Sequence, residues 1–249
     1  MIMSKKTKFK VAITVVSLIL SFLYHLSPYK LEFLGHYYKI WAHRANSAEK
    51  LDSALQYFDG VELDLIYDVE GDFFDVNHLT SESVGLKFEE YLNTLDKTQH
   101  PLLWLDIKNL NKDTAGNILD KLLRIFRKRN HPLKNILIET RYADALPIFT
   151  KEGFRTSYYL PYDLRKRDEE KLQVVIRKIE MILSEQPSIG ISTNHRDYHI
   201  IKEHFPNRRK YIWILVPFIN IDFFITKEIL NDEKVEVVLI NYNALKGNR

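Results

Sequence analysis

Eight short, largely apolar runs alternate with helix-like stretches from residue 40 onward, and this alternation restricts the folds open to the chain. Runs of four to seven residues that are rich in apolar side chains are typical of parallel strands buried on both faces. They occupy residues 40–43, 61–67, 102–107, 136–140, 156–160, 189–192, 211–216 and 235–241. The stretches between them have the apolar spacing of amphipathic helices: 47–57, 88–95, 113–128, 143–149, 168–183, 197–205 and 222–230.

This pattern predicts an α/β protein of the (β/α)8 TIM barrel type. A doubly wound open sheet is the alternative, and the lack of a Gly-rich phosphate loop after the first run weighs against its nucleotide-binding form. A chain of 249 residues that is 45% apolar is long enough for one such barrel. The last run ends near Tyr242, so the eighth helix is missing or replaced, and residues 27–39 are expected to cover the gap.

An apolar segment at residues 11–26 precedes the predicted barrel. As a helix it would be about 24 Å long, a little shorter than a hydrocarbon core of about 30 Å. Four lysines and no acid lie within the first ten residues, so we predict an N-terminal transmembrane helix with a cytoplasmic N-terminus. The predicted division is a membrane anchor at 1–27 and an extracytoplasmic barrel domain at 28–249.

Two other interpretations of this segment are open. A cleaved signal peptide needs small residues near the cleavage point, and residues 22–26 provide none. A buried helix of a soluble protein fits poorly with the four unbalanced lysines. These four lysines carry a charge of +4, whereas the formal net charge of the chain is +3, so the rest of the chain is close to neutral. A near-neutral domain offers no electrostatic case for binding nucleic acid. The absence of cysteine excludes disulfides and thiolate metal sites.

Charged and imidazole side chains gather where the first two predicted strands end. His43 and Arg44 end the first strand, Glu62 and Asp64 lie two residues apart on the second, and His78 follows in a loop. Residues two apart on a strand share a face, so the two carboxylates repel each other unless a cation lies between them. A histidine before the pair and another after it can supply a general acid and a general base.

The same spacing recurs on the next two strands, as Asp106 with Lys108 and Glu139 with Arg141. Catalytic groups of TIM barrels lie at the carboxyl ends of the strands, so these side chains are expected to converge. Carboxylate oxygens suit Mg²⁺ or Ca²⁺ rather than zinc. The predicted site therefore has three groups: metal ligands Glu62, Asp64 and Asp106; phosphate-binding residues Arg44 and Lys108; and the acid–base pair His43 and His78.

The motifs Ala-His-Arg at 42–44 and Gly-Val-Glu-Leu-Asp at 60–64, with His78 fourteen residues after Asp64, resemble those of the glycerophosphodiester phosphodiesterases. These enzymes belong to the phospholipase-C-like phosphodiesterase superfamily of (β/α)8 barrels. The resemblance implies that the two histidines are the acid–base pair and that the Glu-x-Asp carboxylates bind a divalent metal. It covers residues 40–108 by motif and the rest by strand pattern only.

The chain departs from this family at several positions. The third acid comes from Asp-Ile-Lys at 106–108, which looks more like the sphingomyelinase-D-like branch. The Asn-Ser that follows at 46–47 resembles the menorin-type relatives. Ala45 stands where the family has Gly, Leu79 where it has Asp, and Trp-Ile-Leu-Val at 213–216 where it has Trp-Thr-Val-Asn.

The expected function is metal-dependent cleavage of a phosphodiester, either a glycerophosphodiester or a phospholipid headgroup, by a membrane-anchored hydrolase of lipid metabolism. A non-catalytic binding module for a phosphorylated lipid or an envelope polymer is the alternative, and a scaffold without a ligand is a third. The residues do not distinguish Mg²⁺ from Ca²⁺, attack by water from attack by a substrate hydroxyl, or one oligomeric state from another.

Overall fold

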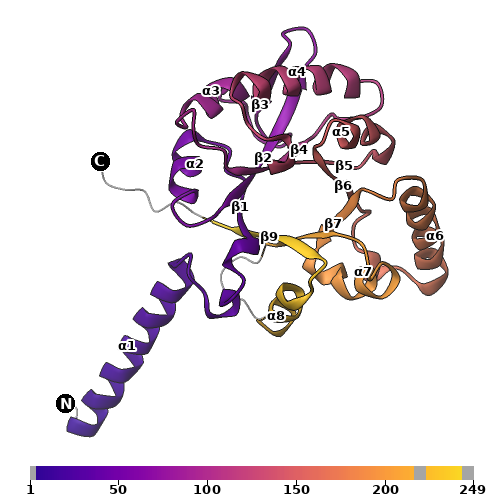
Figure 1. The fold of residues 1–249 in the computed structure, drawn as a ribbon. Helices are drawn as coiled ribbons and strands as arrows, with labels where there is room; N and C mark the ends of the chain where they lie inside the picture. Colours follow the sequence, from indigo (N-terminus) through magenta and orange to yellow (C-terminus); the bar gives the residue numbers. More distant parts are fainter. Residues whose placement is uncertain (1–3, 216–222, 243–249) are drawn as a thin grey trace.

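Eight parallel strands form a closed ring in the computed structural model, which describes residues 4–215 and 223–242 (Figure 1). The ring closes because β1 pairs with β2 on one side and with β9 on the other. This confirms the predicted (β/α)8 barrel and excludes the open sheet. The eight strands are β1 (Ile40–His43), β2 (Gly60–Asp68), β4 (Leu102–Ile107), β5 (Ile136–Thr140), β6 (Arg155–Tyr159), β7 (Gly190–Asn194), β8 (Lys210–Ile214) and β9 (Val235–Asn241).

Helices follow the strands and surround the ring (Figure 1). Ser47 caps the first of them as predicted, since its side chain accepts a hydrogen bond from the Lys50 N–H. The α-helices are α2 (Ala48–Ala54), α3 (Phe88–Asn93), α4 (Ala115–Lys128), α5 (Pro147–Lys151), α6 (Glu169–Glu185), α7 (Tyr198–His204) and α8 (Phe223–Asn231). The 3₁₀ turns are η1 (Leu31–Phe33), η2 (Tyr37–Lys39), η3 (Leu133–Asn135), η4 (Ala143–Ala145), η5 (Leu164–Lys166) and η6 (His195–Asp197).

One predicted helix is divided in the structure, and one strand of the structure was not predicted. The predicted helix 143–149 is divided into η4 and α5, because Pro147 lacks an N–H and begins a new helix at its first position. A ninth strand, β3 (Phe73–Val76), was not predicted; it pairs antiparallel with the last residues of β2. Position 216 of the predicted strand 211–216 and position 222 of the predicted helix 222–230 lie outside the described residues.

The segment before β1 lies where the eighth helix of a barrel would be. Phe33 is buried, and its turn η1 packs against α8. On the other side, the ring of Tyr29 lies 5.8 Å from that of Tyr57, just after α2. Lys39 donates hydrogen bonds to the carbonyls of Leu230 and Asp232 at the end of α8. The segment therefore bridges the end of α2 and α8 across β9 and β1.

Large side chains fill the interior of the ring below its carboxyl-terminal mouth. Trp41, Trp104 and Tyr211 are fully buried there with Leu137, Val237 and Leu239. Gly60 makes room for this packing, because a Cβ atom at position 60 would overlap the indole ring of Trp41. The barrel is therefore closed below, and a cavity forms where the strands end.

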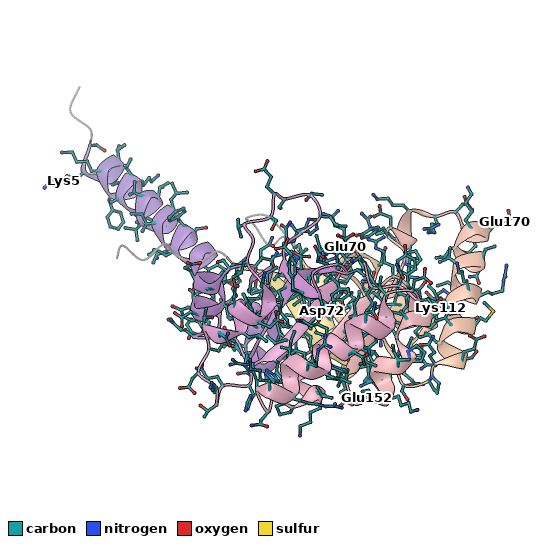
Figure 2. The ribbon with its side chains drawn as sticks, turned by 90° about the horizontal axis from the view of Figure 1, so that it is seen from above. Lys5, Glu70, Asp72, Lys112, Glu152 and Glu170 are labelled. Carbon is teal, nitrogen blue, oxygen red and sulfur yellow. The ribbon has the colours of Figure 1, made fainter. Side chains whose placement is uncertain are left out.

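The helix α1 (Lys5–Leu26) extends away from the barrel, with Lys5 at its far end (Figures 1 and 2). It is the one helix among the described residues that is long and apolar enough to cross a membrane, and its apolar window packs against no other part of the protein. Tyr24 near its end donates a 2.5 Å hydrogen bond to Glu32, so α1 is fastened directly to the segment before the barrel.

Candidate active site

All seven residues predicted for the site line one cavity of about 560 Å³ at the carboxyl-terminal mouth of the barrel. They come from consecutive parts of the ring, namely the end of β1, the middle of β2, the turn after β3 and the end of β4. Parallel strands place their carboxyl ends on one side of a barrel, which brings these distant positions together. The seven residues are His43, Arg44, Glu62, Asp64, His78, Asp106 and Lys108.

Three carboxylates form an acidic cluster on one wall of this cavity. Glu62 and Asp64 point inward from β2, and Asp106 lies beside Asp64 in the register of β2 with β4. One oxygen from each of the three lies within 4.8 Å of the others. A shared Mg²⁺ or Ca²⁺ needs oxygens about 2.0–2.6 Å from its centre, so this spacing fits a single cation. The residues present therefore suit a hard divalent metal.

The electrostatics of the cluster also favour a bound cation. Burial, together with the neighbouring Asp64 and Asp106, raises the pKa of Glu62 well above its usual range. Burial also raises the pKa of Asp106. Like charges held this close in a buried place are stable only with positive charge nearby. Lys108 supplies some of it, since its Nζ lies 2.5 Å from Asp64 Oδ1 and donates a hydrogen bond to Asp106.

A strained turn after β1 wraps around the acidic cluster. Arg44 has a φ of 52°, an uncommon conformation for a residue with a side chain. This conformation directs its backbone N–H toward Glu62 Oε2, at 2.7 Å, while its guanidinium Nε lies 3.5 Å from Asp64 Oδ2. Asn46 then bonds Asp64 twice, donating from its amide to the carboxylate and accepting from the backbone N–H. Asn46 therefore orients Asp64, a role the sequence analysis did not assign.

Both histidines lie beside the acidic cluster. His43 Nε2 is 3.7 Å from Glu62 Oε2, and burial, helped by the Arg44 charge, lowers the pKa of His43 to about 3. His78 is half-buried, and burial lowers its pKa as well. His78 Nδ1 lies 2.8 Å from the Thr80 hydroxyl and 3.3 Å from the Thr80 backbone nitrogen, so Thr80 orients the ring. Because both pKa values are lowered, both rings are neutral near pH 7 in this arrangement.

A second wall of the cavity contains side chains that had no role in the predicted site. They are Glu139 and Arg141 from the end of β5, Tyr159 from β6, Tyr162 after β6 and Trp213 from β8. The two-residue spacing of Glu139 and Arg141 predicted that both would converge with the other strand ends, and they do. The loop position of Tyr162 gave no such signal.

Glu139 is buried at the base of this second wall. Trp104 Nε1 donates to one of its oxygens at 2.8 Å, and the Ser192 hydroxyl donates to the other. Burial, with a contribution from Asp106, raises the pKa of Glu139 to about 8. The carboxyl group thus ties three strands together beneath the acidic cluster.

The structure defines a TIM barrel with an acidic, histidine-flanked cavity at its mouth, and solved structures of other proteins share the barrel fold. A glycerophosphodiester phosphodiesterase from Parabacteroides distasonis ATCC 8503 matches with a TM-score of 0.56 and 15% identity, over 82% of this chain and 92% of that chain. A phosphodiesterase from Oleispira antarctica, solved with its product sn-glycerol-3-phosphate, matches with a TM-score of 0.53 and 14% identity, over 82% and 93%.

A third similar structure, from Silicibacter pomeroyi DSS-3, is assigned as a glycerophosphoryl diester phosphodiesterase; it matches with a TM-score of 0.57 and 13% identity, over 89% and 94%. No protein-family model and no curated protein matches the sequence. The chain therefore has the barrel fold of the glycerophosphodiester phosphodiesterases, as the resemblance of its motifs implied.

Proposed function

We propose that the protein is a divalent-cation-dependent phosphodiesterase that cleaves a glycerophosphodiester or a phospholipid headgroup. One observation carries the proposal: three carboxylates that fit a single cation share a cavity with two histidines and two cationic side chains. Similarity of fold to known phosphodiesterases supports it.

Glu62, Asp64 and Asp106 would hold Mg²⁺ or Ca²⁺, which would neutralise charge on a phosphate oxygen. Arg44 and Lys108 lie against the same carboxylates and are placed to bind the remaining phosphate oxygens. The fork of Arg44 and the point charge of Lys108 then fix the orientation of the phosphorus relative to the histidines.

His43 and His78 form the acid–base pair of this proposal. One ring takes the proton from the attacking hydroxyl, of water or of the substrate itself, as the new P–O bond forms. The other gives a proton to the leaving alcohol oxygen as the second P–O bond breaks.

The helix α1 is proposed as a single membrane anchor, with its lysines on the cytoplasmic side and the barrel outside. Its exposed apolar surface supports this topology, since nothing in the described part of the protein covers it. The anchor would keep the cavity close to lipid or envelope substrates.

The test is an assay of the full-length protein in detergent against bis(p-nitrophenyl) phosphate and a panel of glycerophosphodiesters and lysophospholipids, with Mg²⁺, Ca²⁺ or EDTA. We expect cation-dependent product release that falls about 100-fold or more in both His43→Ala and His78→Ala. His199→Ala, on an exposed face of α7, is the matched control.

Full activity in both histidine variants, or equal activity in EDTA, would overturn the proposal. Cation binding without turnover of any substrate would instead favour a binding module.

A further inference from the structure

Arg141 occupies an unusual position on the second wall of the cavity. It follows β5, which pairs with β4, and lines the same cavity as the acidic cluster, but its guanidinium is turned toward side chains of β6 and the loop after it. In the part of the chain that the structure describes, no carboxylate lies within ion-pairing distance of its guanidinium, whereas Arg44 and Lys108 both lie against Asp64. Arg141 is therefore a cationic group that the proposed chemistry does not use.

Two tyrosine rings hold this guanidinium in place. Its central carbon lies 4.3 Å from the ring centre of Tyr159 and 4.2 Å from that of Tyr162. The two rings meet at 89°, with centres 5.2 Å apart, so the guanidinium packs into the corner between them. Trp213 supports the corner from behind, at 4.9 Å and 89° from Tyr159. Arg141 and Tyr162 are both exposed at the mouth, where a ligand can reach them.

This packing leaves a defined set of hydrogen-bond donors. The two rings are nearly perpendicular, so they cover at most one flat face and one edge of the planar guanidinium, whose five N–H groups lie along its edges. The N–H groups on the remaining edges stay available to a ligand in the cavity. A guanidinium held against two rings loses less rotamer freedom when it binds an oxyanion, which reduces the entropic cost.

We infer that Arg141, clamped by Tyr159 and Tyr162, is a binding subsite for a second anionic group of the substrate, distinct from the phosphate that is cleaved. The guanidinium lies against Tyr159 of β6, which is two strands from β4 and three from β2, so this subsite is displaced around the mouth from the acidic cluster. The second anion would be a carboxylate or a phosphate carried by the alcohol part of the diester. The inference rests on the proposed function and narrows its substrate class to diesters with an additional negative charge.

Two matched pairs of probes test this subsite with the full-length protein. Glycerophosphoserine differs from glycerophosphoethanolamine by one carboxylate, and glycerophosphoglycerol phosphate differs from glycerophosphoglycerol by one phosphate. A charged, two-pronged hydrogen bond is worth about 10- to 100-fold in affinity, so we expect this preference for the anionic member of at least one pair in kcat/KM. The pair that shows it identifies the anion.

The variants make the test specific to the guanidinium. The preference should fall to near unity in Arg141→Gln, fall partly in Arg141→Lys, and weaken in Tyr162→Leu, which removes one clamping ring. Arg177→Gln, at an exposed position on α6, should retain it. Each preference is a ratio measured within one protein sample, so a lower folded fraction in a variant does not change it.

Calorimetric binding of the same pairs to His43→Ala separates this inference from the proposed function. Cation-dependent turnover with no anionic preference in either pair overturns the subsite and leaves the phosphodiesterase standing. If the anionic member of a pair binds more tightly, this preference requires Arg141, and the native protein turns over no substrate, then the subsite is supported and the proposed phosphodiesterase reaction is overturned. Absence of both preference and binding overturns the subsite.

Discussion

Replacing Glu62 with glutamine removes one negative charge from the acidic cluster while keeping the shape of the side chain and its acceptor for the Arg44 N–H. One oxygen of Glu62 lies within 4.8 Å of oxygens of Asp64 and Asp106. At an effective dielectric constant of about 20, each such pair repels by roughly 3 kcal/mol, and Lys108 offsets part of that. Without added cation, we expect Glu62→Gln to be about 1–3 kcal/mol more stable than the native protein at alkaline pH.

The gain in stability of Glu62→Gln over the native protein should decrease as pH falls. The pKa of Glu62 is raised in the folded protein, so the repulsion acts fully above that pKa and fades as pH falls and the carboxylate takes up a proton. The stability difference between Glu62→Gln and the native protein should therefore shrink toward acidic pH.

Urea unfolding at several pH values, in EDTA or in millimolar Ca²⁺ or Mg²⁺, measures both effects. A cation at a hundredfold excess over its Kd should stabilise the native protein by about 2.7 kcal/mol and leave Glu62→Gln nearly unchanged. Glu185→Gln, at the exposed end of α6, is the control for loss of one negative charge. Lower stability of Glu62→Gln in EDTA would contradict the predicted repulsion, and equal stabilisation of both proteins by cations would contradict the predicted cation site.

Three further predictions concern other parts of the molecule. Burial lowers the pKa of His131 to about 4, so protonation of this ring should lower the free energy of unfolding by up to about 3 kcal/mol as pH falls from 6.5 to 4. Urea unfolding should show that this contribution is missing in His131→Gln. Gly60→Ala places a methyl group against the Trp41 ring and should cost about 1–3 kcal/mol; an unchanged thermal midpoint would contradict this packing. Asn46→Ala frees Asp64 and should weaken calorimetric cation affinity about 10- to 100-fold, whereas unchanged affinity would exclude that orienting role.

Most of the barrel follows from local sequence pattern, because its buried strands are marked by runs of apolar residues. The four-residue β3 escaped detection for a physical reason. Its pairing depends on β2 continuing beyond the ring and on the turn in which Asp68 accepts a hydrogen bond from the Gly71 N–H. The helix break at Pro147 carried a local signal, since proline favours the first position of a helix.

The acidic side of the site was predictable because residues two apart on a strand share a face. This rule placed Glu62 with Asp64, and Asp106 with Lys108, and the order of strands around the ring then joined the pairs. The aromatic wall was not predictable in this way. Arg141 meets Tyr159 because β5 pairs with β6, and it meets Tyr162 through the conformation of the loop after β6, which no short spacing encodes.

The short connection between α1 and the barrel limits how far the cavity can travel from a membrane. Four residues separate Leu26, at the end of α1, from Leu31, at the start of η1, and even fully extended they span roughly 17 Å. The hydrogen bond from Tyr24 to Glu32 shortens this reach further. In the proposed topology, the barrel would sample only a thin layer next to the bilayer, where diesters held at the surface have a high local concentration. Turnover of such substrates would then depend on their density in the membrane plane more than on their bulk amount.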